Sequence, residues 1–455
     1  MIRSLTATAV LAMLSFGAHA ADAPSGYTKC AQNTGAQCSF SGTRRVAFGK
    51  NDSFVYATFT GGVACRGTSF PTSQWTTTNS AWCSYANTTT SSSSSSVSSS
   101  SSSSVSSSSS SSVSSSASSS SSSGNTGGIV NKQVGWSTLN GGTTGGAGGA
   151  TVTVRTGTEL NQALCSRATK TTPIIIRVDG TINHGNTTKV SGQCDTAADR
   201  ISLKGVQNVS IIGVSNRALF DQMGIHIREA RNIIIQNVHV RNVKKSGSPT
   251  SNGGDAIGME TNVSNVWVDH VTLEASGGEK EGFDGLFDMK DNTKYVTLSW
   301  SILKNSERGG LVGSGDTDNQ NNFITYHHNY YQNLNSRVPL LRFATAHSFN
   351  NYYNGIVESG MNPRIGGKIK AENNYFTNAK DPIGTFYTND MGFWDVSGNI
   401  FAAGVTWTAK ADKNHPAGPN PVSTTSISIP YAYTLDPAAN VPNIVTNGAG
   451  AGKMP

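Results

Sequence analysis

Short apolar strings recur along the second half of the chain, and each ends at a turn residue that is polar, aromatic or glycine. Each string is rich in β-branched and aromatic residues, either in a continuous run or alternating with polar residues, which is typical of strands. The strong strings begin at Val209, Ile233, Val266, Val296 and Ile324, the residues that follow them are Gly213, Asn237, His270, Trp300 and His328, and weaker strings extend the series to Asn350, Asn373 and Gly398. The steps of about 22 to 33 residues hold strand-length runs and Asn- and Gly-rich turns, with no room for a helix.

A coil-length period predicts a β-solenoid, an all-β fold in which each coil buries its apolar residues against the next. Equivalent turns then carry Asn or His, whose side chains can hydrogen-bond along the stack. The alternative, a β-sandwich, would show strands roughly every 8–12 residues without a coil-length period. The observed spacing favours the solenoid.

The ends of the repeat carry different patterns. Thr156-Gly157-Thr158-Glu159 has the spacing of a capping box, and Leu160, Ala163 and Leu164 give the residues after it one apolar helical face. We expect a short helix there that closes the open end of the stack, as solenoid caps do. The tail from Pro416 onward has no period, and we expect it to pack along the outside of the coils.

Composition divides the chain into four parts. Residues 88–123 are almost pure serine, a stretch with nothing to bury, and we interpret 87–125 as a flexible linker with an end-to-end distance of ~35 Å. Residues 26–86 form a small module before it, and 126–455 form the solenoid domain after it. Such a tether suits a protein in which one part anchors and the other part acts.

Residues 1–20 are predicted to be a signal peptide. They contain Arg3, an apolar stretch from Ala7 to Phe16, and an Ala-x-Ala cleavage pattern at Ala18-His19-Ala20. No other segment approaches the roughly 20 apolar residues of a membrane span. We therefore expect a secreted, extracellular protein with no membrane partner.

The six cysteines are expected to enter an oxidising compartment. Cys165 and Cys194 lie in the second module, and the simplest interpretation is one structural disulfide between them. Metal ligation is disfavoured because no Cys-x-x-Cys pair occurs. The first module has four cysteines, and two disulfides with open connectivity are expected among Cys30, Cys38, Cys65 and Cys83.

The first module has β-prone runs at 45–48 and 54–59, and we predict a small cystine-stapled β fold. Tyr56, Trp75 and Trp82 either form a sugar-stacking face or fill the small core. The serine linker, which tethers this module to the larger domain, favours the carbohydrate-binding interpretation.

The whole chain has 455 residues, 13% of them charged, with 49 glycines and a formal net charge of +7. This composition is typical of a turn-rich extracellular protein, and the positive charge favours an anionic partner. No nucleic-acid motif occurs, and the basic residues form no run, so we expect no nucleic-acid partner.

The candidate chemistry lies within the repeat. Asp284 and Asp288 are four residues apart, so an extended segment would project both carboxylates from one face together with Leu286 and Lys290. Paired acids repel unless a cation lies between them, and their hard oxygen atoms suit calcium. Asp255 in the preceding coil can supply a third carboxylate. Taken alone, acids at this spacing are more often surface charges.

Several motifs together resemble the pectate lyases of polysaccharide lyase family 1. The similarity covers roughly residues 151–401 and is ordered along the chain. The motifs are Gly254-Asp255-Ala256-Ile257, Val266-Trp267-Val268-Asp269-His270, Asp284-Gly285-Leu286-Phe287-Asp288-Met289-Lys290, His327-His328-Asn329-Tyr330-Tyr331 and Arg337-Val338-Pro339-Leu340-Leu341-Arg342. The first module resembles only loosely the small cystine modules of secreted bacterial polysaccharide enzymes.

This resemblance implies a right-handed parallel β-helix that cleaves polygalacturonate by calcium-dependent β-elimination to 4,5-unsaturated products. It assigns Arg337 as the base that removes the C5 proton. The calcium ligands it implies are Asp255, Asp284 and Asp288, and the substrate contacts are Arg342, Lys290, Arg308 and Arg364. A guanidinium is almost always protonated, so an arginine that acts as a base needs cationic neighbours that lower its pKa. We therefore expect the activity to have an alkaline pH optimum. We expect the enzyme to act as a monomer.

Two positions depart from the family pattern. Gly253 stands where several members have an aspartate that helps to hold a substrate-bridging calcium ion, and Arg308 stands where a lysine is usual. Arg308 keeps the charge and adds bidentate carboxylate recognition. Asp269 and His270 invite a catalytic interpretation, but adjacent strand residues face opposite sides, so we assign His270 to the stack, and the same applies to His327 and His328.

Three alternatives remain open from the sequence. A polygalacturonase would use acids and water on the same fold, and Asp284 and Asp288 mimic such a pair. A pectin lyase would not need calcium, so the three aspartates disfavour it. A non-catalytic polysaccharide-binding solenoid is the third alternative.

Overall fold

The computed structural model describes residues 23–24, 27–50, 53–70, 81–86, 132–248, 250 and 252–454, which divide into two compact units, one before and one after the junction of Ser119 and Ser120. The predicted signal peptide, the predicted serine linker and Trp75 lie outside the described residues. Each unit is treated separately below.

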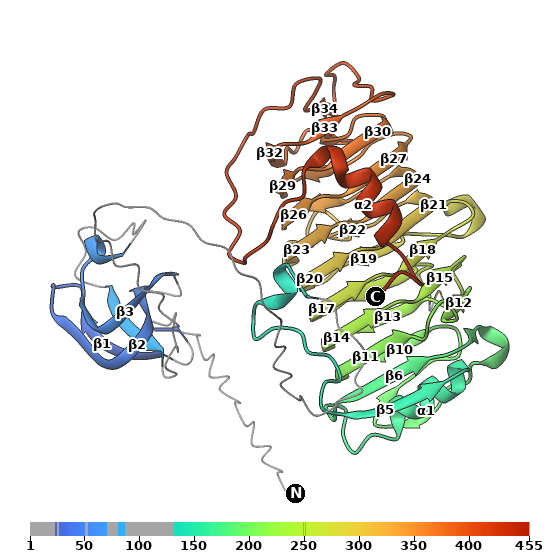
Figure 1. The fold of residues 1–455 in the computed structure, drawn as a ribbon, viewed down its shortest axis with the longest axis horizontal. Helices are drawn as coiled ribbons and strands as arrows, with labels where there is room; N and C mark the ends of the chain where they lie inside the picture. The colour runs from blue at the N-terminus through green and yellow to red at the C-terminus, as the bar shows by residue number, and fades with distance from the viewer. Residues whose placement is uncertain are drawn as a thin grey trace, which may run out of the picture. The chain divides into compact units, whose positions relative to one another are not determined.

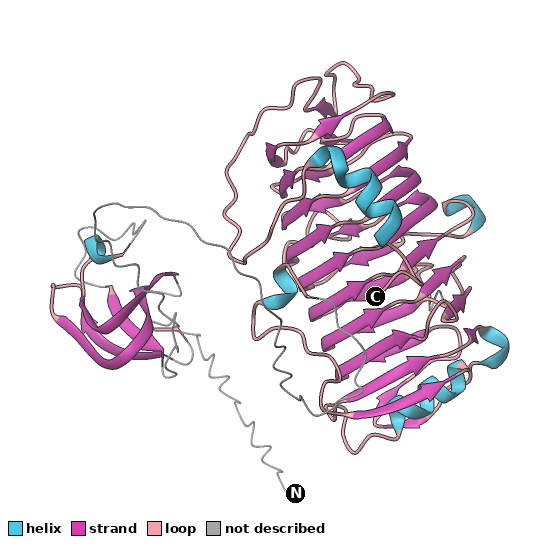
Figure 2. Ribbon diagram, in the orientation of Figure 1, coloured by secondary structure: helices cyan, strands magenta, loops and turns pink. Residues whose placement is uncertain are grey.

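The second unit is a right-handed parallel β-helix built from three parallel sheets, so the predicted fold class is confirmed. Figure 1 shows the strands stacked coil upon coil, and Figure 2 shows how little of this unit is helical. Each full coil gives one strand to each sheet, because every strand pairs with its counterpart in the next coil. Corresponding residues therefore repeat along the stack at the strand spacing of about 4.8 Å.

The seven-stranded sheet comprises β10 (Ile201–Lys204), β13 (Ile225–Arg228), β16 (Ile257–Glu260), β19 (Phe287–Met289), β22 (Leu311–Val312), β25 (Leu340–Arg342) and β28 (Asn362–Arg364). The ten-stranded sheet comprises β5 (Ala150–Val154), β6 (Ile174–Val178), β11 (Gln207–Gly213), β14 (Arg231–Gln236), β17 (Ser264–Asp269), β20 (Lys294–Ser299), β23 (Asn322–His327), β26 (Thr345–Phe349), β29 (Lys368–Glu372) and β32 (Phe393–Ser397).

The nine-stranded sheet comprises β7 (Thr181–Ile182), β12 (Leu219–Asp221), β15 (His239–Arg241), β18 (Thr272–Glu274), β21 (Ile302–Arg308), β24 (Tyr330–Ser336), β27 (Tyr352–Ile356), β30 (Tyr375–Ala379) and β33 (Ile400–Phe401). Two small pairs complete the unit, β8 (Ser191–Gly192) with β9 (Cys194–Asp195) and β31 (Gly384–Phe386) with β34 (Asn414–Pro416).

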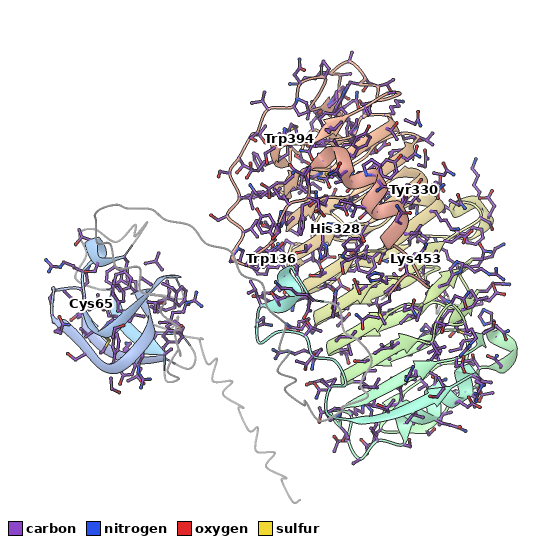
Figure 3. All side chains as sticks on the ribbon, viewed as in Figure 1. Cys65, Trp136, His328, Tyr330, Trp394 and Lys453 are labelled. Atoms are coloured by element: carbon purple, nitrogen blue, oxygen red, sulfur yellow. A yellow bond between two sulfur atoms is a disulfide. The ribbon has the colours of Figure 1, made fainter. Side chains whose placement is uncertain are left out.

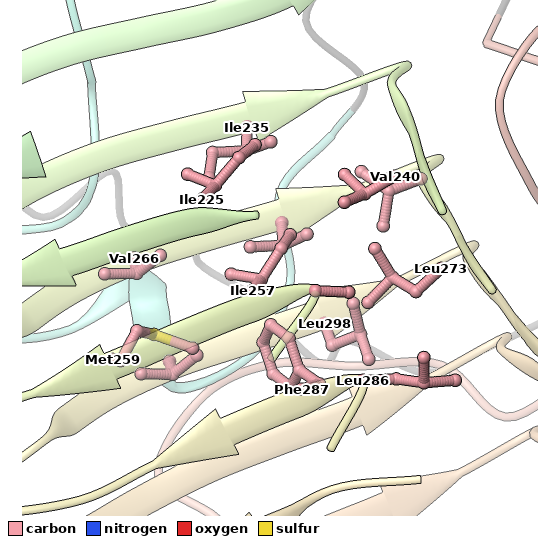
Figure 4. Close-up of a cluster of buried hydrophobic side chains, with 14 of the residues drawn as sticks. Ile225, Ile235, Val240, Ile257, Met259, Val266, Leu273, Leu286, Phe287 and Leu298 are labelled. Atoms are coloured by element: carbon pink, nitrogen blue, oxygen red, sulfur yellow. The ribbon is translucent and has the colours of Figure 1, made fainter. Parts of the chain in front are cut away.

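The interior of the coils is a continuous apolar core. Inward side chains of adjacent coils lie over one another, as Ile225, Ile257 and Phe287 do along the seven-stranded sheet. Figure 4 shows this stacking with Val240, Leu273 and Leu298 from the other sheets. Burial of each such side chain stabilises the fold by about 1.5–3 kcal/mol, so the core stabilises the solenoid coil by coil.

All but one of the turn positions predicted from the repeat share one backbone conformation, and Gly213 is the exception. Residues 237, 270, 300, 328, 350, 373 and 398 all have a positive φ between 46° and 64°. His270, Trp300 and His328 stack ring on ring there. The hydrogen-bonded ladder that we expected at these positions instead lies mainly one residue later.

That ladder consists of the buried asparagines Asn329, Asn351 and Asn374 and the partly buried Asn399. The side-chain oxygen of each of the last three accepts a bond of 2.9–3.0 Å from the backbone N–H of the ladder asparagine one coil earlier. The side-chain nitrogen of each donates to a backbone carbonyl one coil earlier. Each asparagine thus satisfies turn groups that would otherwise be buried without a partner.

Helix α1 (Gly157–Cys165) forms where the sequence predicted it. Thr156 and Glu159 make the capping box, and Leu160 and Leu164 enter the core at the end of the stack. Cys165 and Cys194 form a disulfide beside this helix. The cap therefore combines an apolar helical face with a covalent link.

The C-terminal tail packs on the outside of the coils, as predicted, and also contains helix α2 (Val441–Gly448). Tyr431 Oη lies 2.7 Å from His347 Nδ1, and Tyr433 Oη donates to Glu372 Oε2 at 2.6 Å. Asp436 Oδ2 lies 2.9 Å from Nε2 of His328, which Figure 3 labels close to α2. No helix in the described ranges is both long and apolar enough to span a bilayer.

The first unit is a four-stranded antiparallel sheet in the order β1-β4-β2-β3. Its strands are β1 (Tyr27–Gln32), β2 (Gln37–Lys50), β3 (Ser53–Ala64) and β4 (Trp82–Ala86). Disulfides join Cys30 to Cys38 and Cys65 to Cys83, and the buried residues include Val46, Phe48 and Phe70. The remaining one-turn 3-10 segments of the chain are 67–69, 136–138, 184–186, 279–281 and 438–440.

Candidate active site

The predicted site residues gather on and beside the outer surface of the seven-stranded sheet. Asp288 lies on β19 and Lys290 follows it, while Arg342 and Arg364 lie on β25 and β28. Arg342 and Arg364 are register partners, so their side chains project side by side from the sheet. Inward neighbours such as Met289 enter the core. The alternation that fills the core therefore also displays the charged residues.

The three predicted metal ligands converge. Carboxylate oxygens of Asp255, Asp284 and Asp288 all lie within 4.8 Å of one another. Asp255 precedes β16 and Asp284 precedes β19, so two successive coils supply the cluster. Asp255 Oδ1 accepts from the backbone N–H of Gly285 at 3.2 Å, and Asp288 Oδ1 accepts from that of Leu311 at 3.1 Å.

Glycines make room for this cluster. A Cβ at Gly285 would collide with the carboxylate of Asp288, and one at Gly258 would lie 3.1 Å from Asp255 Oδ2. Gly258 pairs with Asp288 in the sheet, so a side chain there would occupy the space next to the acids. The absence of side chains leaves a hollow lined by carboxylates.

The acids repel one another in this partly dry setting. Burial, and then the negative charge of Asp288, raises the pKa of Asp255 to about 8. Burial also raises the pKa of Asp288. Burial opposes ionisation of Asp284 too, but the hydrogen bonds and charges of Arg308 and Lys245 together outweigh it and lower the pKa of Asp284. At neutral pH the isolated cluster therefore favours a bound proton or a further cation.

Lys290 contributes one positive charge. Its Nζ lies 3.1 Å from Asp255 Oδ2 and 3.3 Å from Asp288 Oδ2. Burial alone would lower the pKa of Lys290, but the charge of Asp288 and then that of Asp255 raise it above the ordinary value. Lys290 is therefore a cation within the acidic cluster.

Our expectation that Leu286 projects with the carboxylates was wrong. Leu286 is 2% exposed and belongs to the apolar core, as Figure 4 shows. The segment is a turn before β19 begins at Phe287, so simple strand alternation does not reach back to Asp284. The turn, rather than an extended strand, brings Asp284 towards Asp288.

Three charged residues that the sequence reasoning missed surround Asp284 and Arg342. Lys245 Nζ lies 3.2 Å from Asp284, and Glu279 pairs with Lys245 and Arg308. Asp316 Oδ1 accepts from Nε of Arg342 at 3.1 Å. Lys245 and Asp316 lie in loops and Glu279 in the one-turn 3-10 segment 279–281, where no repeat pattern marks them. Only their charge would have made them candidates.

Arg308 ends β21 and donates from Nη1 to Asp284 Oδ1 at 2.9 Å. Arg342 donates from Nη1 to the carbonyl oxygen of Gly313 at 2.7 Å. Arg364 donates from Nη1 to the carbonyl oxygen of Phe386 at 3.3 Å. Burial, and then the charge of Arg342, lowers the pKa of Arg364 to about 10. These three arginines are thus held in place by the protein itself.

Arg337 differs from these neighbours. It lies between β24 and β25 with a φ of 61°, and within the described part of the chain its guanidinium makes no ion pair. Burial, and then the positive charge of Arg308, lowers its pKa. It lines a cavity of about 320 Å³ together with Arg308, Arg364 and Tyr387.

The geometric reason that we gave for separating Asp269 from His270 was wrong, although His270 does lie in the stack. His270 Nδ1 lies 2.8 Å from Asp269 Oδ2, because the positive φ at His270 turns its side chain back towards the end of β17. Both residues are almost fully buried. They lie on the ten-stranded sheet and its turn, away from the acidic cluster on the seven-stranded sheet.

The acidic cluster fits a calcium ion. Three carboxylates supply hard oxygen ligands, and among the described residues the buried Asp288 Oδ2 has its ion pair with Lys290 but no hydrogen bond. Burial is the main cause of the raised pKa of Asp255, and the negative charge of Asp288 adds to it. A divalent cation would relieve both the repulsion and the missing contact.

Parallel coils with a surface site of clustered acids and arginines define a β-helical polysaccharide lyase. The chain belongs to the pectate lyase family, whose model, described as "Pectate lyase", matches residues 126–454.

Individual relatives agree. A pectate trisaccharide-lyase from Bacillus licheniformis is 43% identical over 321 residues, 70% of this chain and 86% of the relative. The crystal structure of a pectate lyase from Bacillus sp. N165 in complex with trigalacturonate has 34% identity and a TM-score of 0.61, covering 71% of this chain and 99% of that one. Pectate lyase C from Erwinia chrysanthemi, solved at pH 9.5 with 30 mM Ca²⁺, has 27% identity and a TM-score of 0.59, covering 68% and 95%.

Proposed function

We propose that this chain is a secreted, calcium-dependent pectate lyase that cleaves de-esterified polygalacturonate to 4,5-unsaturated oligogalacturonides. The observation that carries the proposal is the convergence of Asp255, Asp284 and Asp288 beside a row of arginines on one sheet. The family membership supports it, as does the trigalacturonate bound to the Bacillus sp. N165 relative.

Arg337 is the proposed base. Its lowered pKa and its freedom from an ion pair among the described residues favour transient loss of a proton, and an alkaline optimum follows. Arg337 takes the proton from C5 of a galacturonate, the released electron pair forms the C4–C5 double bond, and the C4–O bond breaks. The departing oxygen then receives a proton from water.

Substrate recognition rests on the remaining cations. Arg342, Arg364 and Arg308 line the surface around Arg337, and each can pair with a uronate carboxylate. Lys290 adds a charge on the side of the acids. A carboxylate held by such donors stabilises the negative charge that develops as the C5 proton leaves.

Asp255, Asp284 and Asp288 would hold calcium, which when bound supplies a positive charge to the uronate carboxylate and acidifies the neighbouring C5 proton. The protein binds the ion through carboxylates of two successive coils, so the fold sets their spacing. Arg308 and Lys245 keep Asp284 ionised for this task.

The test is turnover of polygalacturonate by the purified protein, followed by the ultraviolet absorbance of the unsaturated product. Activity should disappear in excess chelator and return with added calcium. A hydrolase would release reducing ends without this absorbance, and a non-catalytic solenoid would do neither. Full activity after extensive dialysis against chelator would exclude the metal role.

Secretion is proposed from the first 20 residues. Cleavage after Ala20 would release the mature chain, and N-terminal sequencing of protein recovered from culture medium tests this. Retention of the intact N-terminus inside the cell would contradict it. We further propose the domain boundaries 26–86, 87–125 and 126–455 given by the sequence.

A further inference from the structure

The sheet of the first unit has an aromatic and basic face opposite its apolar core. Side chains on directly paired residues point to the same face, as do those two positions apart. One row across the four strands is Tyr56, Ala47, Ser84 and Lys29, in that order. Arg45, Trp82 and Tyr27 lie two residues from members of this row, so the same face carries them.

The large side chains of this face lie in contact. The guanidinium carbon of Arg45 lies 4.4 Å from the centre of the Tyr56 ring, and Lys29 Nζ lies 4.6 Å from that of Trp82. The rings of Tyr27 and Tyr56 meet edge to face at 6.0 Å. Tyr56 is 39% exposed, and the charged side chains of Lys29 and Arg45 are exposed as well.

The charge of this unit is strongly unbalanced. Residues 27–86 contain five basic residues and one acid, Asp52, which gives a net charge of +4. Lys29 and Arg45 are two strands apart across the sheet and two residues apart along it, which separates their backbone positions by about 12 Å. This separation is more than the length of one sugar residue. The face therefore fits an extended anionic polymer.

We propose that this face, formed by Tyr27, Lys29, Arg45, Tyr56 and Trp82, binds de-esterified polygalacturonate directly, as a second contact with the polymer that the β-helix cleaves. The inference rests on the proposed function for the identity of the polymer. The uronate carboxylates pair with Lys29 and Arg45, which the rings of Trp82 and Tyr56 hold in position.

The arrangement favours an acidic polymer over a neutral one. A neutral, flat glucan needs bare ring faces for stacking, whereas here Arg45 lies over Tyr56 and Lys29 over Trp82. A cation placed over a ring attracts a carboxylate without losing its contact with the ring. Binding should therefore weaken as salt is added.

The experiment measures retention of the full chain on polygalacturonate coupled covalently to a resin, in chelator, so that turnover and calcium-mediated contacts are silent. Lys29→Gln/Arg45→Gln is the test variant. Arg44→Gln is the matched control, because Arg44 neighbours Arg45 in β2 but projects from the opposite face, over Tyr85. Thermal unfolding confirms that each variant is folded.

We expect the double variant to bind roughly five- to tenfold more weakly than the wild type, and Arg44→Gln to stay within about twofold. Tyr56→Ala should weaken binding similarly by removing the platform beneath Arg45. On methyl-esterified pectin resin the double variant and the wild type should not differ. Equal retention of both on polygalacturonate would overturn the proposal, as would equally strong wild-type binding to cellulose or duplex DNA.

Turnover of soluble polygalacturonate with calcium separates this inference from the proposed function. The double variant should retain wild-type turnover, because neither residue belongs to the β-helix. A wild type without lyase activity would refute the proposed function, whatever the resin shows. Full activity together with unchanged resin binding would refute only the binding face.

Discussion

The ammonium nitrogen of Lys290 lies 3.3 Å from Oδ2 of Asp288, a buried carboxylate oxygen that makes this ion pair but no hydrogen bond to the described residues. The protein thus places its own cation where the proposed metal ion is needed. The two positive charges cannot share the site without a cost, because like charges close together in a partly buried setting repel. We therefore expect calcium to compete with Lys290 for these carboxylates.

Replacing Lys290 by Gln should therefore tighten calcium binding to the substrate-free protein by roughly three- to tenfold, since it removes the competing charge. Isothermal titration calorimetry measures the affinity directly. The same change should lower kcat/KM on polygalacturonate, because the lysine is a proposed substrate contact. Lys304→Gln, which affects an ion pair on the nine-stranded sheet, is the control. Weaker calcium binding in Lys290→Gln would contradict this role.

Asp288→Asn should remove the calcium response without unfolding the protein. The amide oxygen can still accept from the backbone N–H of Leu311, while the buried negative charge that raises the pKa of Asp255 is lost. In chelator the free energy of unfolding should be unchanged or higher. Stabilisation at calcium a hundredfold above the wild-type Kd, about 2.7 kcal/mol for the wild type, should fall below roughly 1 kcal/mol. Differential scanning calorimetry with and without calcium measures these stabilities. A large loss of stability of Asp288→Asn in chelator would contradict the idea that the acids repel one another.

Arg337→Lys should lower kcat roughly a thousandfold with KM little changed, because a general base contributes about 10²–10⁴ in rate and the positive charge is retained. Arg342→Ala, in contrast, should raise KM as well, because it removes a proposed carboxylate clamp. Steady-state kinetics on polygalacturonate compares the two. Wild-type turnover in Arg337→Lys would eliminate Arg337 as the base.

Gly253→Asp should lower the calcium concentration needed for half-maximal rate by severalfold in the presence of substrate. A Cβ at Gly253 would lie 3.7 Å from Asp255 Oδ2 and meet nothing closer, so a fourth carboxylate fits without strain. Higher ligand charge tightens calcium binding. Calcium titration of the initial rate measures the shift, and Gly253→Asn separates charge from shape. An unchanged requirement in Gly253→Asp would show that the natural glycine does not limit calcium use.

Acid should loosen the C-terminal tail. Burial alone would raise the pKa of Glu372, but hydrogen bonds from His347 and Tyr433 lower it to about 2. Because this folded value lies below the ordinary 4.5, the contribution to stability is present above pH 4.5 and is lost between about pH 4.5 and 2. Burial also lowers the pKa of His347, so some loss begins below pH 6.5.

We expect Glu372→Gln to be less stable than the wild type at pH 7, on the order of 2 kcal/mol, and to show a flatter dependence of Tm between pH 4.5 and 2. Thermal unfolding followed by circular dichroism across this range tests the sign. The exposed Glu281→Gln serves as the control. If Tm falls with pH in parallel for Glu372→Gln and the wild type, the contact between Glu372 and the tail does not contribute to acid stability.

The coil period could be predicted because each apolar string recurs at one place in every coil and ends at a residue of positive φ, such as Asn237 or Trp300. The grouping of Asp255, Asp284 and Asp288 followed from the family resemblance, since acids four residues apart are ordinary by themselves. The turn before Phe287, which buries Leu286, could not be predicted from strand alternation. Glu279 and Asp316 were missed because loop geometry, which no repeat encodes, brings them to the site.

The asparagine ladder limits how this fold can change its length. Each ladder side chain bridges one coil to the coil before it, while the spacing between ladder members varies from 22 to 25 residues, so the loops between the sheets absorb small differences in coil length. Removing one whole coil would instead rejoin equivalent positions and leave the ladder intact. Small insertions and deletions therefore belong in the loops, whereas the length of the stack itself changes by complete coils, and the surface available to a polymer grows or shrinks in steps of about 4.8 Å.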